Sequence, residues 1–258
     1  GSTSVICTDK TGTLTEGNMQ VTKIETKDLD KSLLTMTLNN EQKTNLETVL
    51  WDYVEKSGKF NPQEIYEKYE KIDEEPFDSE KKYSMTVNRI DGKNIVHLMG
   101  APEIIISFCK LEDEEKKTIL EKIENWADEG LRLLGLCYKE DGNLEEKNNF
   151  VWLGLVGIQD PIREKVKEAI VIAQNAGIKI KIITGDYRKT GEKVAKNLGF
   201  VITQNNVLEG SVLENLSDQD LKSRIENIVL FTRVLPHQKL KIVKALQENG
   251  EVVAMTGD

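Results

Sequence analysis

The chain has 258 residues, of which 38% are hydrophobic and 31% charged, and its net charge is −9. This composition is typical of a globular protein, and the length allows one large domain or two medium ones. The negative charge argues against general nucleic-acid binding, which needs a basic surface. The three cysteines, Cys7, Cys109 and Cys137, are far apart in the chain, so we expect no disulfide framework.

The first predicted element is a short buried strand over residues 4–8, which runs directly into Asp9. A strand over 19–24 is expected to leave this first sheet. Residues 31–150 then differ in composition, because they are rich in Glu and Lys and contain the clear hairpin patterns. Within them we expect helices over 39–56, 102–109 and 112–128, paired strands over 85–90 and 95–98, and a strand over 131–138.

Strands and helices alternate regularly after residue 150. The expected strands are 151–159, 178–183, 228–231 and 251–255, with helices over 161–175, up to 198, and over 236–247. This alternation predicts an α/β fold with a mostly parallel sheet. Since the strand before Asp9 needs neighbours of this kind, we expect residues 29–150 to form a domain inserted between residues 1–28 and 151–258. Two domains in series are the alternative, and they would leave the Asp9 strand without obvious partners.

Three of the predicted parallel strands end in similar polar residues, namely Thr8-Asp9, Thr184-Gly185-Asp186 and Thr256-Gly257-Asp258. The carboxyl ends of such strands meet at one edge of the sheet, where ligands bind in open α/β folds. Carboxylates gathered there would attract Mg²⁺, which prefers oxygen ligands and shares its site with phosphate.

Asp9 is the candidate nucleophile of this edge. Gly12 allows a sharp turn after it, so that backbone N–H groups and threonine hydroxyls can converge on an anion. Lys239, on the helix before the last strand, could neutralise the carboxylate and a phosphate together. We therefore hypothesise that Asp9 accepts a phosphoryl group, an established role for a carboxylate.

The stretch Asp9-Lys10-Thr11-Gly12-Thr13-Leu14-Thr15 resembles the phosphorylation motif of P-type ATPases. Asp160-Pro161-Ile162-Arg163, Thr184-Gly185-Asp186 and Thr256-Gly257-Asp258 resemble later motifs of that family. The resemblance covers essentially the whole chain. It implies a phosphorylation domain of haloacid-dehalogenase-like fold, split by an inserted α+β nucleotide-binding domain. The implied roles are phosphorylation of Asp9 beside Lys239, γ-phosphate contacts from Thr11, Thr184, Gly185 and Asp186, and Mg²⁺ ligation by Asp9, the Thr11 carbonyl and Asp258.

The resemblance also implies an ATP site, to which the inserted domain contributes most residues. Phe77 would stack on adenine, with Lys82 at the polar edge of the base or at the phosphates. The other implied contacts are Glu47 to the adenine amino group, Gly100 in Gly100-Ala101-Pro102-Glu103, Arg132 to the phosphates, and Arg233 to the ribose. Met99 stands where the family usually has a lysine, so we expect weaker ATP binding than in relatives.

Thr11 distinguishes the two enzymatic hypotheses, a phosphatase and a membrane cation pump. Related phosphatases carry a second aspartate at this position as a general acid/base, and a threonine cannot act as a base near neutral pH. An aspartyl phosphate is therefore expected to persist, which suits the cytoplasmic part of a membrane cation pump. Calcium is the first expected ion; proton, sodium/potassium and magnesium pumps are alternatives.

If the chain is part of a pump, membrane-spanning and actuator domains of the full-length chain would act with it. We expect this part itself to be a monomer. Two other hypotheses stay open. One is a soluble phosphatase with an inserted cap domain, and the other is a nucleotide-binding regulatory module without chemistry.

Overall fold

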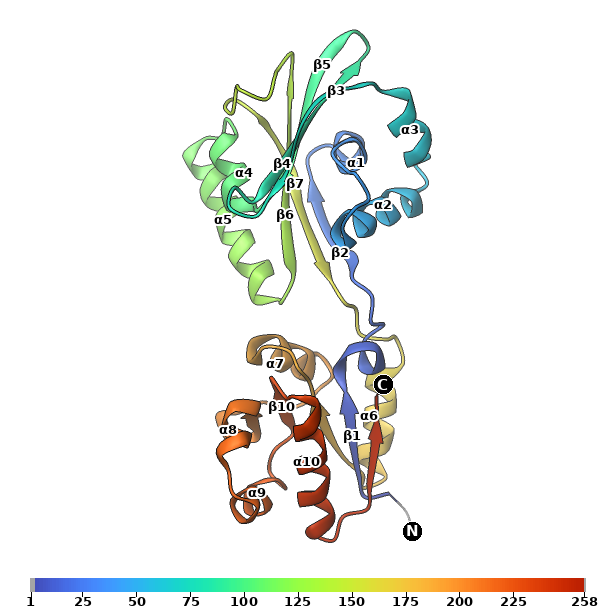
Figure 1. Cartoon of the computed structure of the whole chain (residues 1–258), viewed down its shortest axis with the longest axis vertical. Coiled ribbons are helices and arrows are strands. Elements are labelled where there is room, and N and C mark those ends of the chain that lie inside the picture. Colours follow the sequence, from blue (N-terminus) through green and yellow to red (C-terminus); the bar gives the residue numbers. More distant parts are fainter. Residues whose placement is uncertain (1–2, 258) are drawn as a thin grey trace. The chain divides into compact units, whose positions relative to one another are not determined.

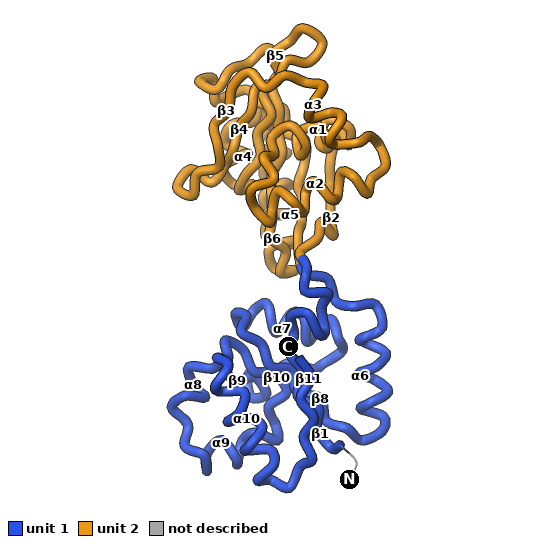
Figure 2. The backbone as a smooth tube through the Cα atoms, turned by 45° about the vertical axis from the view of Figure 1, so that its right-hand side comes forward, with its two compact units in different colours: residues 1–18, 160–258 blue, residues 19–159 orange. Residues whose placement is uncertain are grey.

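The computed structural model describes residues 3–257, which form two compact units. Unit 1 comprises residues 1–18 and 160–258, and unit 2 comprises residues 19–159, so that unit 2 is inserted into unit 1 (Figure 2). The expected α/β fold, with a parallel sheet and an inserted α+β part, is confirmed. The chain passes between the units after residues 18 and 159, whereas the expected boundaries followed residues 28 and 150.

Unit 1 is built on a parallel sheet with the strand order β11-β1-β8-β10-β9. Its strands are β1 (Val5–Asp9), β8 (Lys179–Ile183), β9 (Val207–Glu209), β10 (Leu230–Thr232) and β11 (Val253–Thr256). Its helices are α6 (Val166–Asn175), α7 (Arg188–Asn197), α8 (Gly210–Asn215), α9 (Asp218–Arg224) and α10 (Pro236–Glu248), with short turns at η1 (Lys10–Leu14) and η2 (Gln204–Asn206). Apolar side chains fill both faces of the sheet, since Val5 and Cys7 belong to one core cluster and Ile6 packs against the other.

Unit 2 is built on an antiparallel sheet with the order β2-β7-β6-β5-β4-β3. Its strands are β2 (Gln20–Thr26), β3 (Lys71–Asp78), β4 (Tyr83–Ile90), β5 (Lys93–Gly100), β6 (Arg132–Glu140) and β7 (Val151–Gln159). Its helices are α1 (Leu29–Leu38), α2 (Asn45–Ser57), α3 (Pro62–Lys68), α4 (Pro102–Phe108) and α5 (Asp113–Asp128). Helices α1 to α3 lie on one side of the sheet, and α4 and α5 lie on the other (Figure 1).

The expected hairpin in this sheet forms between β4 and β5. Asp91 and Gly92 have φ values of 48° and 82°. Positive φ at both central residues is the condition for the type I′ turn that an Asp-Gly pair favours. The turn sets the register in which Tyr83 lies opposite Gly100.

Strand β7 corrects one prediction. It was expected in the parallel sheet, but it pairs antiparallel with β2 and β6 in unit 2. Its apolar run is continuous because helices cover both faces of this sheet: Trp152 and Leu155 belong to one core cluster, and Leu153 and Val156 belong to the other. A strand buried on both faces reads the same in a parallel and in an antiparallel sheet.

The helix expected over residues 39–56 also begins later than predicted. Residues 39–44 form a loop, and α2 starts at Asn45 after the N-cap Thr44. Helix α1 precedes this loop and was not predicted. No helix within residues 3–257 has both the length and the apolar character needed to cross a membrane.

Candidate functional site

Asp9 is the last residue of β1, between β8 and β11 in the sheet of unit 1. One carboxylate oxygen, Oδ1, accepts a hydrogen bond from the backbone N–H of Lys10 at 2.7 Å. The other, Oδ2, forms an ion pair with Nζ of Lys239 on α10. The carboxylate is therefore fixed by one backbone donor and one ammonium group, as the sequence pattern suggested for Asp9 and Lys239.

The end of β8 brings a second set of polar groups to the same edge. Asp9 lies opposite Ile183, so Thr184, Gly185 and Asp186 follow beside it. Thr184 is only 1% exposed, and its Oγ1 accepts the N–H of Asp186 at 3.1 Å. The Asp186 carboxylate forms an ion pair of 2.7 Å with Lys10 Nζ.

The end of β11 also lies against the nucleophile. A Cβ atom built on Gly257 would come within 2.8 Å of the Asp9 Cβ, so a larger residue would displace one of the two strands. Asp258, an expected Mg²⁺ ligand, lies outside the described residues.

The loop after Asp9 is held by contacts from the return of the chain to unit 1. Arg163 donates to the carbonyl oxygens of Thr15 at 2.9 Å and Gly12 at 2.8 Å. Asp160 accepts from the Thr15 hydroxyl at 2.6 Å and from the Gly17 N–H at 2.9 Å. These contacts leave Thr11 exposed at the turn, where Gly12 has a φ of 76°.

The contacts of Asp160 and Arg163 also explain a further correction. The helix expected from residue 161 begins at Val166. Ile162 forms a β-bridge with Thr15, and residues 163–165 between this bridge and the helix stay extended or turned. Lys10 was not singled out from the sequence, although it is buried and paired with Asp186. Its position directly after Asp9 was the available signal, but a lysine in a loop is usually solvated.

Behind this edge the sheet buries two titratable side chains, Cys7 and Lys181, which lie opposite each other in β1 and β8. Burial raises the pKa of the Cys7 thiol to about 11. Burial also lowers the pKa of Lys181 to about 8, although its ammonium donates to the carbonyl oxygens of Ile225, Glu226 and Ile228 at 2.7, 3.1 and 2.5 Å. Cys7 therefore stays a neutral core residue near pH 7.

Three of the expected nucleotide contacts come together in unit 2. The register places Asp78, Tyr83 and Gly100 in one row across β3, β4 and β5, so Phe77 and Lys82 each lie one residue from this row. Phe77 is 60% exposed, unlike a core aromatic. The carbonyl of Lys82 accepts the N–H of Ala101 at 2.9 Å.

The close packing around Gly100 in this row leaves no room for a side chain. A Cβ atom at this position would lie 2.4 Å from the Lys82 carbonyl oxygen and 2.6 Å from the Tyr83 Cα. Only glycine therefore permits this approach of the β3–β4 turn to the end of β5. Arg132 opens β6 and is exposed, three residues before Gly135, which pairs with Gly100.

Glu47 makes its contacts within its own loop and helix. It is the third residue of α2 and forms a capping box with Thr44. Its carboxylate accepts hydrogen bonds from the backbone N–H groups of Glu41, Lys43 and Thr44 and from the Thr44 hydroxyl, at 2.9 to 3.2 Å. The structure therefore fixes its position without a direct bond to Phe77, Lys82 or Gly100.

Two further expected residues lie in different surroundings. Met99 is 5% exposed and belongs to the core cluster under α1 and α2. Arg233, in unit 1, has a φ of 51°, and its guanidinium stacks 4.5 Å from the ring centroid of Tyr187. Its backbone N–H donates to the Asp186 carbonyl at 2.9 Å, which joins it to the end of β8.

The oxygen donors beside Asp9 suit a hard cation. The Asp9 carboxylate and the Thr11 carbonyl are the kind of ligands that Mg²⁺ takes, and the close approach of Gly257 puts the end of β11 against Asp9. Residues 3–257 contain no group of three His, Cys, Asp or Glu side chains that could hold a metal by themselves. The donor set therefore fits an ion that completes its shell with water and phosphate.

Comparison with known proteins agrees with this geometry. The family model of the P-type ATPase cytoplasmic domain N matches residues 35–165. The chain belongs to the P-type ATPase family. It is 36% identical to "Calcium-transporting ATPase 1" of Bacillus cereus and 32% identical to the protein of that name from Lactococcus lactis, over 100% of this chain and 33% and 34% of those proteins. A relative from Mycoplasma genitalium, named "Probable cation-transporting P-type ATPase", is 35% identical over 100% of this chain and 30% of its own length.

The chain thus spans about a third of the length of the curated relatives it matches. The family model, over residues 35–165, covers most of unit 2 and only a few residues of unit 1. The alignments with the relatives cover both units. The family assignment therefore applies to the candidate edge in unit 1 as well as to the inserted unit.

Proposed function

We propose that the chain is the ATP-binding and phosphorylated part of a calcium-transporting P-type ATPase. The observation that carries the proposal is the Asp9–Lys239 ion pair at a strand edge that also gathers Thr184 and Asp186, in a chain of this family. In the full-length protein, this part would lie on the cytoplasmic side of a membrane and act with membrane-spanning and actuator segments. Calcium is proposed because two of the relatives above carry it in their names.

In the proposed reaction, an oxygen of the Asp9 carboxylate forms a bond to the γ-phosphorus of ATP while the bond to the bridging oxygen of ADP breaks. Lys239 would hold the attacking carboxylate and offset the negative charge of the incoming phosphoryl group. Thr184 and Gly185 would donate hydrogen bonds to its oxygens. Mg²⁺, when bound by Asp9, the Thr11 carbonyl and Asp258, would neutralise phosphate charge.

The position of Thr11 supports a pump over a phosphatase. It lies exposed at the turn after Asp9, where it could approach a phosphorylated carboxylate, but its hydroxyl cannot take a proton from water near neutral pH. The aspartyl phosphate would therefore outlast that of a phosphatase with an acidic residue at this position. Hydrolysis would wait for another part of the full-length protein.

The proposed ATP site in unit 2 uses Phe77, Lys82 and Gly100, with Glu47 and Arg132 as further contacts. The exposure of Phe77 at the end of β3 supports stacking on a base, since an aromatic ring that packed in the core would be covered. The exposed lysine and arginine would meet the phosphates.

The test is a pair of titrations of the ¹⁵N-labelled chain. MgATP should shift the amide signals of Phe77, Lys82 and Gly100, and beryllium fluoride with Mg²⁺ should shift those of Asp9 and Thr184. Phe77→Ala should remove the first response alone, and Asp9→Asn the second alone. The absence of both responses in the wild-type chain would contradict the proposal. Rapid hydrolysis of p-nitrophenyl phosphate that depends on Asp9 would instead favour the phosphatase.

A further inference from the structure

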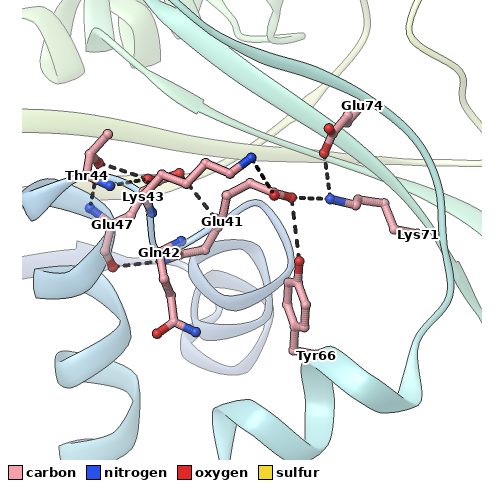
Figure 3. Close-up of polar contacts among 9 residues, drawn as sticks. Glu41, Gln42, Lys43, Thr44, Glu47, Tyr66, Lys71 and Glu74 are labelled. Atoms are coloured by element: carbon pink, nitrogen blue, oxygen red, sulfur yellow. Dashed lines mark hydrogen bonds and ion pairs between the residues drawn. The ribbon is translucent and has the colours of Figure 1, made fainter.

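A network of alternating charges joins the loop before α2 to strand β3 (Figure 3). The Glu41 carboxylate forms ion pairs with Lys71 and, at 3.1 Å, with Lys43. The Lys71 ammonium also pairs with Glu74 at 2.5 Å, and the Tyr66 hydroxyl lies 3.5 Å from the Glu41 carboxylate. Glu41 and Lys71 are only 26% and 30% exposed, so water screens their attraction less than it screens a fully exposed pair.

The loop that carries Glu41 is anchored at several other points. Buried Asn39 donates to the Ser84 carbonyl of β4 at 2.8 Å, and buried Asn40 donates to the Glu47 carbonyl at 2.8 Å. Gln42 has a φ of 53°, a conformation that a non-glycine residue keeps only where its surroundings enforce it. These contacts are typical of a loop held in one shape.

Glu41 connects this network to the proposed adenine contact. Its backbone N–H donates to Oε1 of Glu47 at 3.2 Å, while its own carboxylate accepts from Lys71. Oε2 of Glu47 receives three hydrogen bonds, from Lys43 and Thr44, whereas Oε1 receives one from the described residues. A carboxylate oxygen has two acceptor sites, so Oε1 can accept one more donor, in a direction set by the Glu41 amide.

The strand that begins with Lys71 also carries the proposed base-stacking residue, because Phe77 lies near the other end of β3. The Glu41–Lys71 pair thus ties the loop that holds Glu47 to the strand that holds Phe77. Loss of this pair would release the loop that holds Glu47 while Phe77 stays on β3, so the hydrogen bond to the base would change more than the stacking. The pair itself touches neither of them with its charged groups.

We infer that Glu41 and Lys71 are positioning residues that direct Oε1 of Glu47 toward the 6-amino group of adenine. They thereby set a preference for adenine nucleotides over purines with a 6-oxo group, which cannot donate at this position. This inference rests on the proposed nucleotide site and deepens it by naming what selects the base.

The test compares the binding of ATP and inosine triphosphate by calorimetry, because the two differ where the 6-amino group is replaced by oxygen. Lys71→Met should weaken ATP binding about tenfold, the value of one charge-assisted hydrogen bond, and change inosine triphosphate binding less than about twofold. Lys71→Arg, which can still bridge Glu41 and Glu74, should restore the preference. Lys93→Met, which removes the exposed pair with Glu140, is the matched control and should change neither affinity.

Glu41→Gln is a second variant that should lose the same preference, and tryptophan fluorescence checks that each variant is folded. Equal weakening for both nucleotides, or no weakening for ATP, would overturn the inference while leaving nucleotide binding in place. A wild-type chain that binds neither nucleotide would overturn the proposed function together with the inference. A purely structural role predicts equal losses, so the ratio of the two affinities decides.

Discussion

In unit 1 the charged candidates Asp9, Asp186 and Lys239 are partly buried and lie at the carboxyl edge of a parallel sheet. In unit 2, Phe77, Lys82 and Gly100 lie in or beside one row of an antiparallel sheet, and Phe77, Lys82 and Arg132 are exposed. The Asp9–Lys239 and Lys10–Asp186 ion pairs fix the charged groups of unit 1 in place. Unit 2 instead exposes Phe77, which would stack on the base in the proposed ATP site.

The two units also differ in the base that each one buries. Unit 1 encloses Lys181, whose ammonium is satisfied by three carbonyl oxygens. Unit 2 encloses His97, whose Nδ1 lies 3.0 Å from the Thr35 hydroxyl and whose Nε2 has no partner among the described residues. We therefore expect substitutions at the candidate edge of unit 1 to abolish or strongly slow phosphorylation, and substitutions in unit 2 to change the affinity for the nucleotide by smaller amounts. We also expect acid to destabilise mainly unit 2.

The largest expected effect comes from Asp9→Asn. An amide cannot accept the phosphoryl group, so incorporation of ³²P from labelled ATP should fall by more than about a thousandfold. ATP binding by unit 2 should stay unchanged in the same variant. Asp218→Asn, at an exposed position of the same unit, is the matched control. Hydroxylamine-sensitive phosphate on the Asp9→Asn variant would show that another residue is the nucleophile.

Lys239→Met should have the next largest effect. Loss of the ammonium leaves Asp9 Oδ2 without its ion pair and removes a cation from the approach of phosphate, so the phosphorylation rate should fall about a hundredfold. Lys244→Ala, an exposed lysine on the same helix, should leave the rate unchanged. If both variants lose activity equally, general loss of positive charge explains the effect and the specific pair does not.

Acid should distinguish the cores of the two units. Burial lowers the pKa of His97 to about 3, below its usual value of 6.5, so the unfolded state binds the proton first as the pH falls. Stability from His97 is complete above pH 6.5 and declines by about 1.4 kcal/mol per pH unit below it. Between pH 6.5 and 4.5 unit 2 should therefore lose about 2–3 kcal/mol, read by Trp51, Trp126 and Trp152, which all lie in it.

Unit 1 should not share this loss. Because the pKa of Lys181 is lowered to about 8, its protonation reduces the free energy of unfolding of unit 1 only as the pH falls from 10.5 to 8. Below that range Lys181 adds no further dependence of stability on pH. Amide exchange in β1 measures unit 1 separately. The control for unit 2 is His97→Gln, in which the stability read by tryptophan fluorescence should no longer fall between pH 6.5 and 4.5. If the stability of this variant falls as steeply as that of the wild-type chain, carboxylates and not His97 cause the loss. Glu41, whose pKa is lowered to about 2 mainly by its hydrogen bond from Lys71, titrates below this window.

The edge of unit 1 could be predicted because its evidence is local in sequence. Apolar strands that end in Asp9 and in Thr184-Gly185-Asp186 must bring those ends together once the sheet is parallel. The turn at Asp91 and Gly92 was predictable for the same reason, since it depends on two adjacent residues.

The parts that could not be predicted depend on contacts between distant residues. The apolar run of β7 shows that both its faces are buried but does not show which strands flank it. The pairing of Lys10 with Asp186, and of Glu41 with Lys71, follows from the fold and leaves no spacing pattern. Asn39 and Asn40 resemble a helix start in sequence, yet they are buried and anchor a loop.

The smallest expected effect concerns Met99, for which the sequence resemblance led us to expect weaker ATP binding. Its thioether lies in the apolar cluster under α1 and α2, beside Gly100 in the proposed nucleotide row. Met99→Lys should strengthen ATP binding about threefold, since the lysine stem can keep the apolar contacts while its ammonium extends toward the nucleotide. Met99→Leu, which preserves the apolar contacts without a charge, should leave the affinity unchanged. The same affinity for the lysine and leucine variants would show that the buried position does not face ATP, and would confine the site to the exposed residues of the row.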